Sequence, residues 1–105
     1  MSETAPATEV RKTLSDPVTL EVPVKRGSEA IGEVRVRRPH SGEMRGLNLH
    51  DLLKLDVDAM MKVLPRVTVP SLTAAEVDAL DPADLVALSS EIADFLVPAG
   101  MRPPA

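Results

Sequence analysis

The side chains best suited to catalysis or metal binding in this 105-residue chain are two histidines and a pair of adjacent serines. His40 and His50 have no cysteine and no third histidine beside them at the spacing that metal sites use. Ser89 and Ser90 lack the glycine-flanked turn that exposes a catalytic serine, and no glycine begins the Gly-Lys-Ser/Thr sequence of a phosphate-binding loop. We therefore expect no enzyme, no metal site and no cofactor, with both histidines in exposed or capping positions.

Five cations cluster in one short stretch of the chain. They are Lys25, Arg26, Arg35, Arg37 and Arg38, set against Glu29 and Glu33. Taken alone the cluster suggests RNA, but no aromatic residue lies among the cations to stack a base, and the net charge of −4 disfavours phosphate. Because alternating charges on a strand usually form a solvated face, we predict such a face and no nucleic-acid partner. An acidic protein suits the cluster better.

The last predicted helix carries more apolar surface than one core contact requires. A stripe of about 100° suits packing on a core, and it consists of Leu85, Leu88, Ile92, Phe95 and Leu96. Val86, Ala93 and Val97 widen the apolar arc to roughly 200°, which Ser89 interrupts. Asp84, Glu91 and Asp94 are expected to keep the remaining face in solvent. Val86, Ala93 and Val97 are therefore covered either by their own domain or by a partner, and we take them as candidate partner-binding residues.

Met60 and Met61 are adjacent in the chain and add a second candidate for partner binding. Flexible thioethers can form an adaptable binding surface, although methionine also fills irregular cores. Both uses remain open at this point.

The elements that position these residues begin with a hairpin. Residues 1–16 have no apolar period, which predicts a disordered tail ahead of a domain over residues 17–97 and a flexible tail over 98–105. Val18, Leu20 and Val22 alternate with polar residues, which indicates a strand with one buried face. Pro23 favours an edge position for that strand. A second alternating segment ending near Val36 completes the hairpin.

Short helices follow the hairpin, after one short turn at residues 41–46. Asn48 can cap a helix, and Pro65 is expected to end the helical stretch. Asp56 either continues the helix begun at Asn48 or caps a new one, and the sequence leaves this open.

Two further helix starts lie close together near the end of the chain. Thr73 and Glu76 form a capping box, and Asp81 precedes Pro82 at a first helical position. The last helix should run from Pro82 to about Val97. The sequence thus predicts an α+β domain: an N-terminal β-hairpin followed by a small bundle of three or four short helices.

Composition and charge narrow the class of protein further. The chain has no cysteine, no apolar stretch of membrane-spanning length and no signal-peptide pattern, so we expect a soluble cytosolic domain. Up to Arg66 there are 11 Lys or Arg against 10 Asp or Glu, whereas beyond it Arg102 stands against six acids. A chain with this asymmetry could self-associate or meet partners head to tail.

Several sequence elements occur in a familiar order. They are the hairpin, Arg37-Arg38-Pro39 leading into residues 41–46, residues 56–62, residues 72–85 and the helix ending in Asp94-Phe95-Leu96. In this order the chain resembles the small tail assembly chaperones of long-tailed and contractile-tailed bacteriophages and prophages. The resemblance implies a non-enzymatic protein of the host bacterial cytoplasm, absent from the finished tail. It also implies that the protein keeps the tape measure protein soluble until tail tube subunits polymerise.

The resemblance further implies particular partners. In many family members a ribosomal frameshift adds a second domain to some copies, so a longer form of the chain and the tail tube protein join the tape measure protein as expected partners. A homo-oligomer is also compatible with the sequence. The alternative is a small regulatory or antitoxin-like protein-binding module, although the sequence shows no helix-turn-helix with basic recognition positions.

Overall fold

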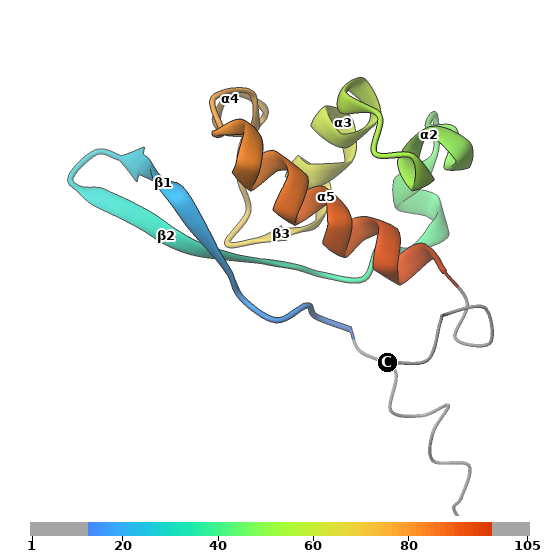
Figure 1. Cartoon of the computed structure of the whole chain (residues 1–105), viewed down its shortest axis with the longest axis horizontal. Coiled ribbons are helices and arrows are strands. Elements are labelled where there is room, and N and C mark those ends of the chain that lie inside the picture. Colours follow the sequence, from blue (N-terminus) through green and yellow to red (C-terminus); the bar gives the residue numbers. More distant parts are fainter. Residues whose placement is uncertain (1–12, 98–105) are drawn as a thin grey trace, which may run out of the picture.

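A computed structural model describes residues 13–97, and it confirms the α+β class (Figure 1). The described part contains β1 (Val18–Arg26), β2 (Glu29–Val36), the 3₁₀ helix η1 (Ser41–Met44) and α2 (Leu49–Leu53). It continues with α3 (Val57–Val67), β3 (Thr68–Val69), α4 (Ala74–Asp78) and α5 (Pro82–Leu96). The C-terminal tail and residues 1–12 of the predicted N-terminal tail lie outside the described residues.

The predicted hairpin is present, and its first strand lies at a sheet edge. β1 and β2 pair antiparallel around Gly27, which has the positive φ of 58° that a tight hairpin turn requires. β3 adds to β2, giving the sheet order β1-β2-β3. The edge position that Pro23 indicated for β1 is confirmed. The two-residue β3 is too short to produce an alternating pattern, so the sequence did not predict it.

A bulge interrupts β1 and overturns part of the predicted alternation. Thr19 pairs with Glu33 and Val24 with Ile31, so residues 20–23 all stand opposite Gly32. Leu20 is buried as expected, but Val22 is 53% exposed. The extra residues rotate the strand, and Val24 rather than Val22 packs against the core.

Asp84 of α5 holds this bulge. Its carboxylate accepts from the backbone N–H of Glu21 at 2.7 Å and from that of Val22 at 3.1 Å. The expectation that Asp84 faces solvent is therefore wrong, because its side chain is 1% exposed. The bulge removes two backbone donors from the strand ladder, and the buried carboxylate of Asp84 supplies their acceptors instead.

The N-terminal boundary of the ordered domain lies earlier than residue 17. The backbone of Ser15 donates to the carbonyl of Val36 at 2.8 Å, and its hydroxyl accepts from the Val36 N–H at 2.9 Å. Leu14 forms an isolated bridge with Arg37. Ser15 is buried, so residues 13–16 belong to the sheet rather than to a disordered tail.

The helix starts follow the predicted caps. Asn48 accepts from the N–H of His50 and Asp56 from that of Ala59, so α2 and α3 are separate helices. Leu55, with a φ of 61°, lies between them. The end predicted at Pro65 is wrong, because α3 continues to Val67. A proline this close to the end of a helix removes only one backbone hydrogen bond.

The capping box at Thr73 and the start at Asp81 are also confirmed. The Thr73 hydroxyl accepts from the N–H of Glu76, whose carboxylate accepts from the N–H of Thr73. Asp81 accepts from the N–H of Ala83, and Pro82 is the first residue of α5. Residues 79–81 form the corner between α4 and α5.

α5 lies at the centre of the fold, in contact with both strands of the hairpin, α2 and α3 (Figure 1). The core combines the inner face of the sheet with one side of each larger helix. Its fully buried members include Val34, Val36, Leu52, Met60, Val63, Leu64, Val67, Leu88 and Ile92. The fold therefore covers one side of α5 and leaves Val86 on the opposite side largely exposed.

Candidate partner-binding surface

The inner side of α5 matches the predicted core stripe. Leu88 and Ile92 are fully buried, Phe95 is nearly so, and Leu85 and Leu96 pack against the core with part of their surface exposed. This side anchors the helix within its own domain.

The outer side of α5 carries Val86 and Ala93 of the three positions predicted from the sequence, and Val97 is the C-cap that follows the helix. Val86 is 57% exposed, and Ala93 and Val97 are half-buried. Seven residues separate Val86 from Ala93, which places their side chains within about 20° of each other around the helix axis. The domain therefore leaves Val86 largely uncovered. We call Val86, Ala93 and Val97 the α5 stripe.

The two methionines have different positions. Met60 is fully buried in the core, so it cannot contact a partner while the domain remains folded, and we withdraw it as a binding residue. Met61 is half-buried and packs against the core. Of the two uses of methionine, Met60 therefore has the core-filling one, because it lies on the side of α3 that the core covers.

Three exposed aliphatic residues were missed as site candidates. Leu49 and Leu53 of α2 are 55% and 48% exposed, and Val57 at the start of α3 is 54% exposed. The spacing of Leu49 and Leu53 places them on one side of a helix, with the buried Leu52 on another. The four-residue spacing of Leu49 and Leu53 is the signal in the sequence that indicates this outward face.

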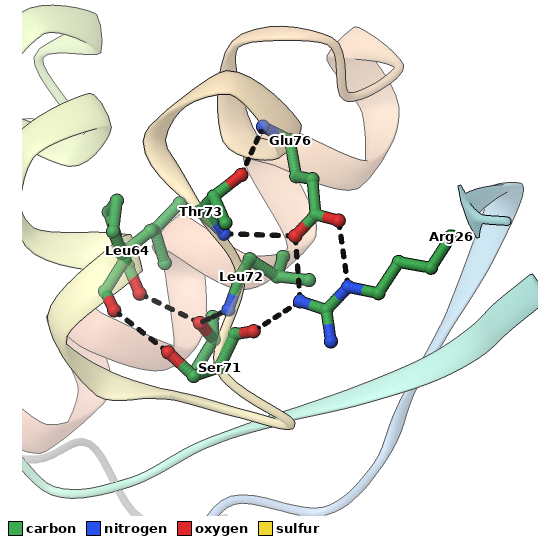
Figure 2. Close-up of polar contacts among 8 residues, drawn as sticks. Arg26, Leu64, Ser71, Leu72, Thr73 and Glu76 are labelled. Carbon is green, nitrogen blue, oxygen red and sulfur yellow. Dashed lines mark hydrogen bonds and ion pairs between the residues drawn. The ribbon is translucent and has the colours of Figure 1, made fainter.

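The four arginines of the hairpin cluster bind partners within the chain. Arg26 makes a two-pronged contact with Glu76, at 2.8 Å from Nε to Oε2 and 2.7 Å from Nη2 to Oε1. Its Nη2 also donates to the Ser71 carbonyl. Figure 2 shows Glu76 completing the cap of Thr73 while it holds Arg26. The tip of the hairpin is thereby attached to the start of α4.

Three further arginines of the cluster are engaged in the same way. Arg37 contacts both oxygens of Glu43 and donates to the Arg66 carbonyl at 2.7 Å. Arg38 lies 5.0 Å from the centre of the Phe95 ring and donates to the Phe95 carbonyl at 3.3 Å. Arg35 donates to the Ser15 carbonyl. Each arginine of the cluster therefore has a partner within the domain, which the sequence did not predict, while Lys25 and Arg35 remain exposed as expected for a solvated strand face.

These ion pairs keep two carboxylates charged. Hydrogen bonds from Arg37 and from the backbone of His40 lower the pKa of Glu43 to about 2. Hydrogen bonds from Arg26 and from the backbone of Thr73 lower the pKa of Glu76 to about 2. At neutral pH both groups are acceptors and cannot donate a proton.

The remaining candidates for chemistry are dispersed. His40 and His50 are exposed, Ser89 is buried in α5, and the Ser90 hydroxyl donates to the Val86 carbonyl at 2.9 Å. Within residues 13–97 no three His, Asp or Glu side chains gather as a metal site would require. In the same part of the chain no helix is long and apolar enough to cross a membrane.

Comparison with known proteins now adds to this geometry. The family model described as phage tail assembly chaperone proteins, E, or 41 or 14, matches residues 17–97, from the residue before β1 to the end of the α5 stripe. The chain belongs to this family. Its role is therefore in phage tail assembly.

Two relatives from Escherichia phage P2 support the same family assignment. Tail assembly protein E is 47% identical over 81 residues, which are 77% of this chain and 89% of the relative. Tail assembly protein E' is 48% identical over 80 residues, which are 76% of this chain and 56% of the relative. The chain thus spans just over half the length of E'. No solved structure matches the chain.

Proposed function

We propose that this tail assembly chaperone binds the tape measure protein in the host bacterial cytoplasm and keeps it soluble until tail tube subunits polymerise around it. It is then released and does not enter the finished tail. This role requires a binding surface and no catalytic residue. A frameshift-extended form of the chain, a second copy and the tail tube protein complete the partners that we propose.

The observation that carries the proposal is the exposure of the α5 stripe. The family assignment supplies a role in tail assembly, and the fold leaves Val86 more than half exposed on a helix whose other side is core. A chaperone of this kind must cover apolar surface on its client, and uncovered aliphatic side chains on a stable helix provide that contact.

The proposal for a longer partner is supported by the two relatives. E and E' match nearly the same part of this chain, but the match is 89% of E and only 56% of E'. A chaperone domain shared by a short and a long product would let the long product connect the client to further tail proteins.

Co-expression tests the function directly. The tape measure protein encoded by the same phage or prophage is expressed with and without the full chain, and its soluble fraction is measured. We expect the chain to raise that fraction and to co-purify with the tape measure protein. An unchanged soluble fraction together with no co-purification would overturn the proposal.

Charged variants of the α5 stripe then test the site. Val86→Glu combined with Ala93→Glu should leave the circular dichroism of the domain unchanged and abolish co-purification, because both charges would be buried without partners in the complex. Since Ala93 is half-buried, Val86→Glu alone serves as the second variant. The matched control is Val69→Glu, which places the same charge on a valine that is 43% exposed on β3. Capture that survives in a folded stripe variant would rule out this surface.

A further inference from the structure

We propose that the docking surface continues from the α5 stripe across α2 to Leu49, Leu53 and Val57, and that its occupant is an amphipathic α-helix with basic residues flanking an apolar stripe. This inference rests on the proposed function only for the identity of the client. The surface and the chemistry of its occupant are argued from the fold and tested without the client.

Contacts with the hairpin establish which side of α5 faces the sheet. Asp84 binds the backbone of β1, and Arg38, two residues after β2, stacks on Phe95, so the sheet lies along the line of Asp84 and Phe95. At about 100° per residue, Ala93 lies about 180° around the axis from Asp84. The fully buried Leu88 and Ile92 lie between these two directions. Since α5 also contacts α2 and α3, we infer that this buried arc faces those helices and that the α5 stripe borders this helical side of the domain.

α2 lies on that helical side and packs against α5 and α3. Its Leu52 points into the core, whereas Leu49 and Leu53 remain about half exposed. Val57, which begins α3, is 54% exposed. Two sets of uncovered aliphatic side chains thus lie on helices that contact each other, which is the arrangement expected where apolar residues form an interaction site.

The spacing along α5 favours a helical occupant. Val86 and Ala93 are separated by seven residues, an interval at which one helix contacts another laid along it, and Val97 follows at the C-cap of α5. Ser90 and Ala93 are small, so they let the backbone of such a helix approach closely.

Charge identifies the flanks of the occupant. Between residues 67 and 97 the chain carries six carboxylates and no lysine or arginine. Asp84 is buried against β1 and Glu76 is paired with Arg26, so the surface charge of this segment comes from the other four carboxylates. Asp94 follows Ala93 in the chain and is exposed, and Asp58 follows Val57 and is also exposed. On α2, Lys54 lies 3.7 Å from Asp51. An occupant with lysine or arginine beside its apolar stripe is attracted to this half of the molecule, whereas α5 of a second copy would bring carboxylates against carboxylates.

Two designed peptides test this inference with the full chain. Each is a helix of about 20 residues, long enough to lie along the whole of α5. The two share one leucine stripe and differ only in flanks of lysine or of glutamate. Fluorescence anisotropy measures the binding of each peptide at low and at high salt.

We expect the lysine-flanked peptide to bind at least about tenfold more tightly than the glutamate-flanked one, and the preference to shrink as salt rises. Leu53→Glu and Val86→Glu should each weaken its binding by about tenfold or more, and Val69→Glu by less than about twofold. Leu49→Glu replaces Leu53→Glu if circular dichroism shows that the latter is unfolded.

Other outcomes would overturn the inference. Equal binding of both peptides contradicts the basic flanks, and full binding by folded Leu53→Glu and Leu49→Glu removes α2 from the surface. A dimer in analytical ultracentrifugation that dissociates in these variants, with no peptide binding, would identify a second copy as the occupant instead. If the tape measure protein is still solubilised while the lysine-flanked peptide does not bind, this inference fails and the proposed function stands. If the peptide binds but the tape measure protein is not solubilised, the proposed function fails and this inference stands.

Discussion

The hairpin side of the molecule and the outer side of α5 differ in whether their side chains have partners within the domain. On the hairpin side, the four arginines and the buried carboxylate of Asp84 all have partners within the domain. On the outer side of α5, Val86 is 57% exposed and no described element covers it. The most prominent feature of the sequence, its cation cluster, thus serves folding. A plain aliphatic stripe is the better candidate for function.

The difference teaches that charge density alone does not identify a binding surface. An arginine that already donates to a carboxylate and a carbonyl of its own chain has few N–H groups left for a partner. An exposed valine, in contrast, can still stabilise a complex when its side chain is buried there. Changes on the hairpin side should therefore reduce stability, and changes on the outer side of α5 should reduce partner binding alone.

The largest loss of stability should follow Asp84→Asn. The amide keeps the shape of the side chain, but its NH2 group would face one of the two N–H groups that the carboxylate oxygens now accept from, so one backbone donor of the bulge loses its acceptor beside the buried residue 84. We expect the free energy of unfolding to fall by about 3 kcal/mol in urea titration. The control Asp78→Asn, at the exposed end of α4, should stay within about 0.5 kcal/mol of the parent. Equal stability of both variants would show that Asp84 does not hold the bulge.

A smaller loss is expected for Ser15→Ala, which removes the hydroxyl that accepts from the Val36 N–H. The buried donor would lack an acceptor, at a cost of about 2 kcal/mol in the free energy of unfolding. Ser90→Ala, on the exposed side of α5, provides the comparison and should change stability by less than about 0.5 kcal/mol. If the two serines behave alike in thermal unfolding, residues 13–16 are not part of the folded sheet.

The helix caps should each contribute less again. Thr73→Ala and Asp81→Ala remove the acceptors for the first turns of α4 and α5, so each should lower the free energy of unfolding by about 1 kcal/mol. Chemical denaturation followed by circular dichroism measures both. If neither substitution changes the free energy of unfolding, these caps do not stabilise the corner between α4 and α5.

The smallest effect should come from the exposed ion pairs and should depend on pH. Glu43 and Glu76 have a pKa near 2 in the folded chain against an ordinary 4.5, so their contribution is present above the higher value and is lost as pH falls toward 2. Stability should therefore decline over this interval, modestly because both pairs contact solvent. Glu43→Gln should make the decline shallower, and Glu33→Gln, on the exposed strand position, should not. An identical decline in both variants would exclude the pair of Arg37 and Glu43 as its source.

The α+β class and the helix starts could be predicted because their causes are local. The side chains of Asn48, Thr73 and Asp81 each accept from an N–H two or three residues ahead, and this geometry forms whenever the helix does. The prediction at Pro65 failed because the helix had only two residues left to run, and the sequence does not show where tertiary packing ends it. The strand pattern failed at Val22 because a bulge shifts the side-chain alternation.

By itself the sequence determined the hairpin, the capped helices, the inner stripe of α5 and the acidic C-terminal half, since each depends on residues near one another in the chain. Only the tertiary structure decided where the arginines and Asp84 find their partners, since most of these contacts join residues dozens of positions apart. It also decided which apolar residues remain uncovered. Met60 and Val86 are both apolar residues on helices, and no feature of the neighbouring sequence shows which of them is buried. Burial is a property of the packed neighbours, and those neighbours exist only once the sheet and the helices have come together.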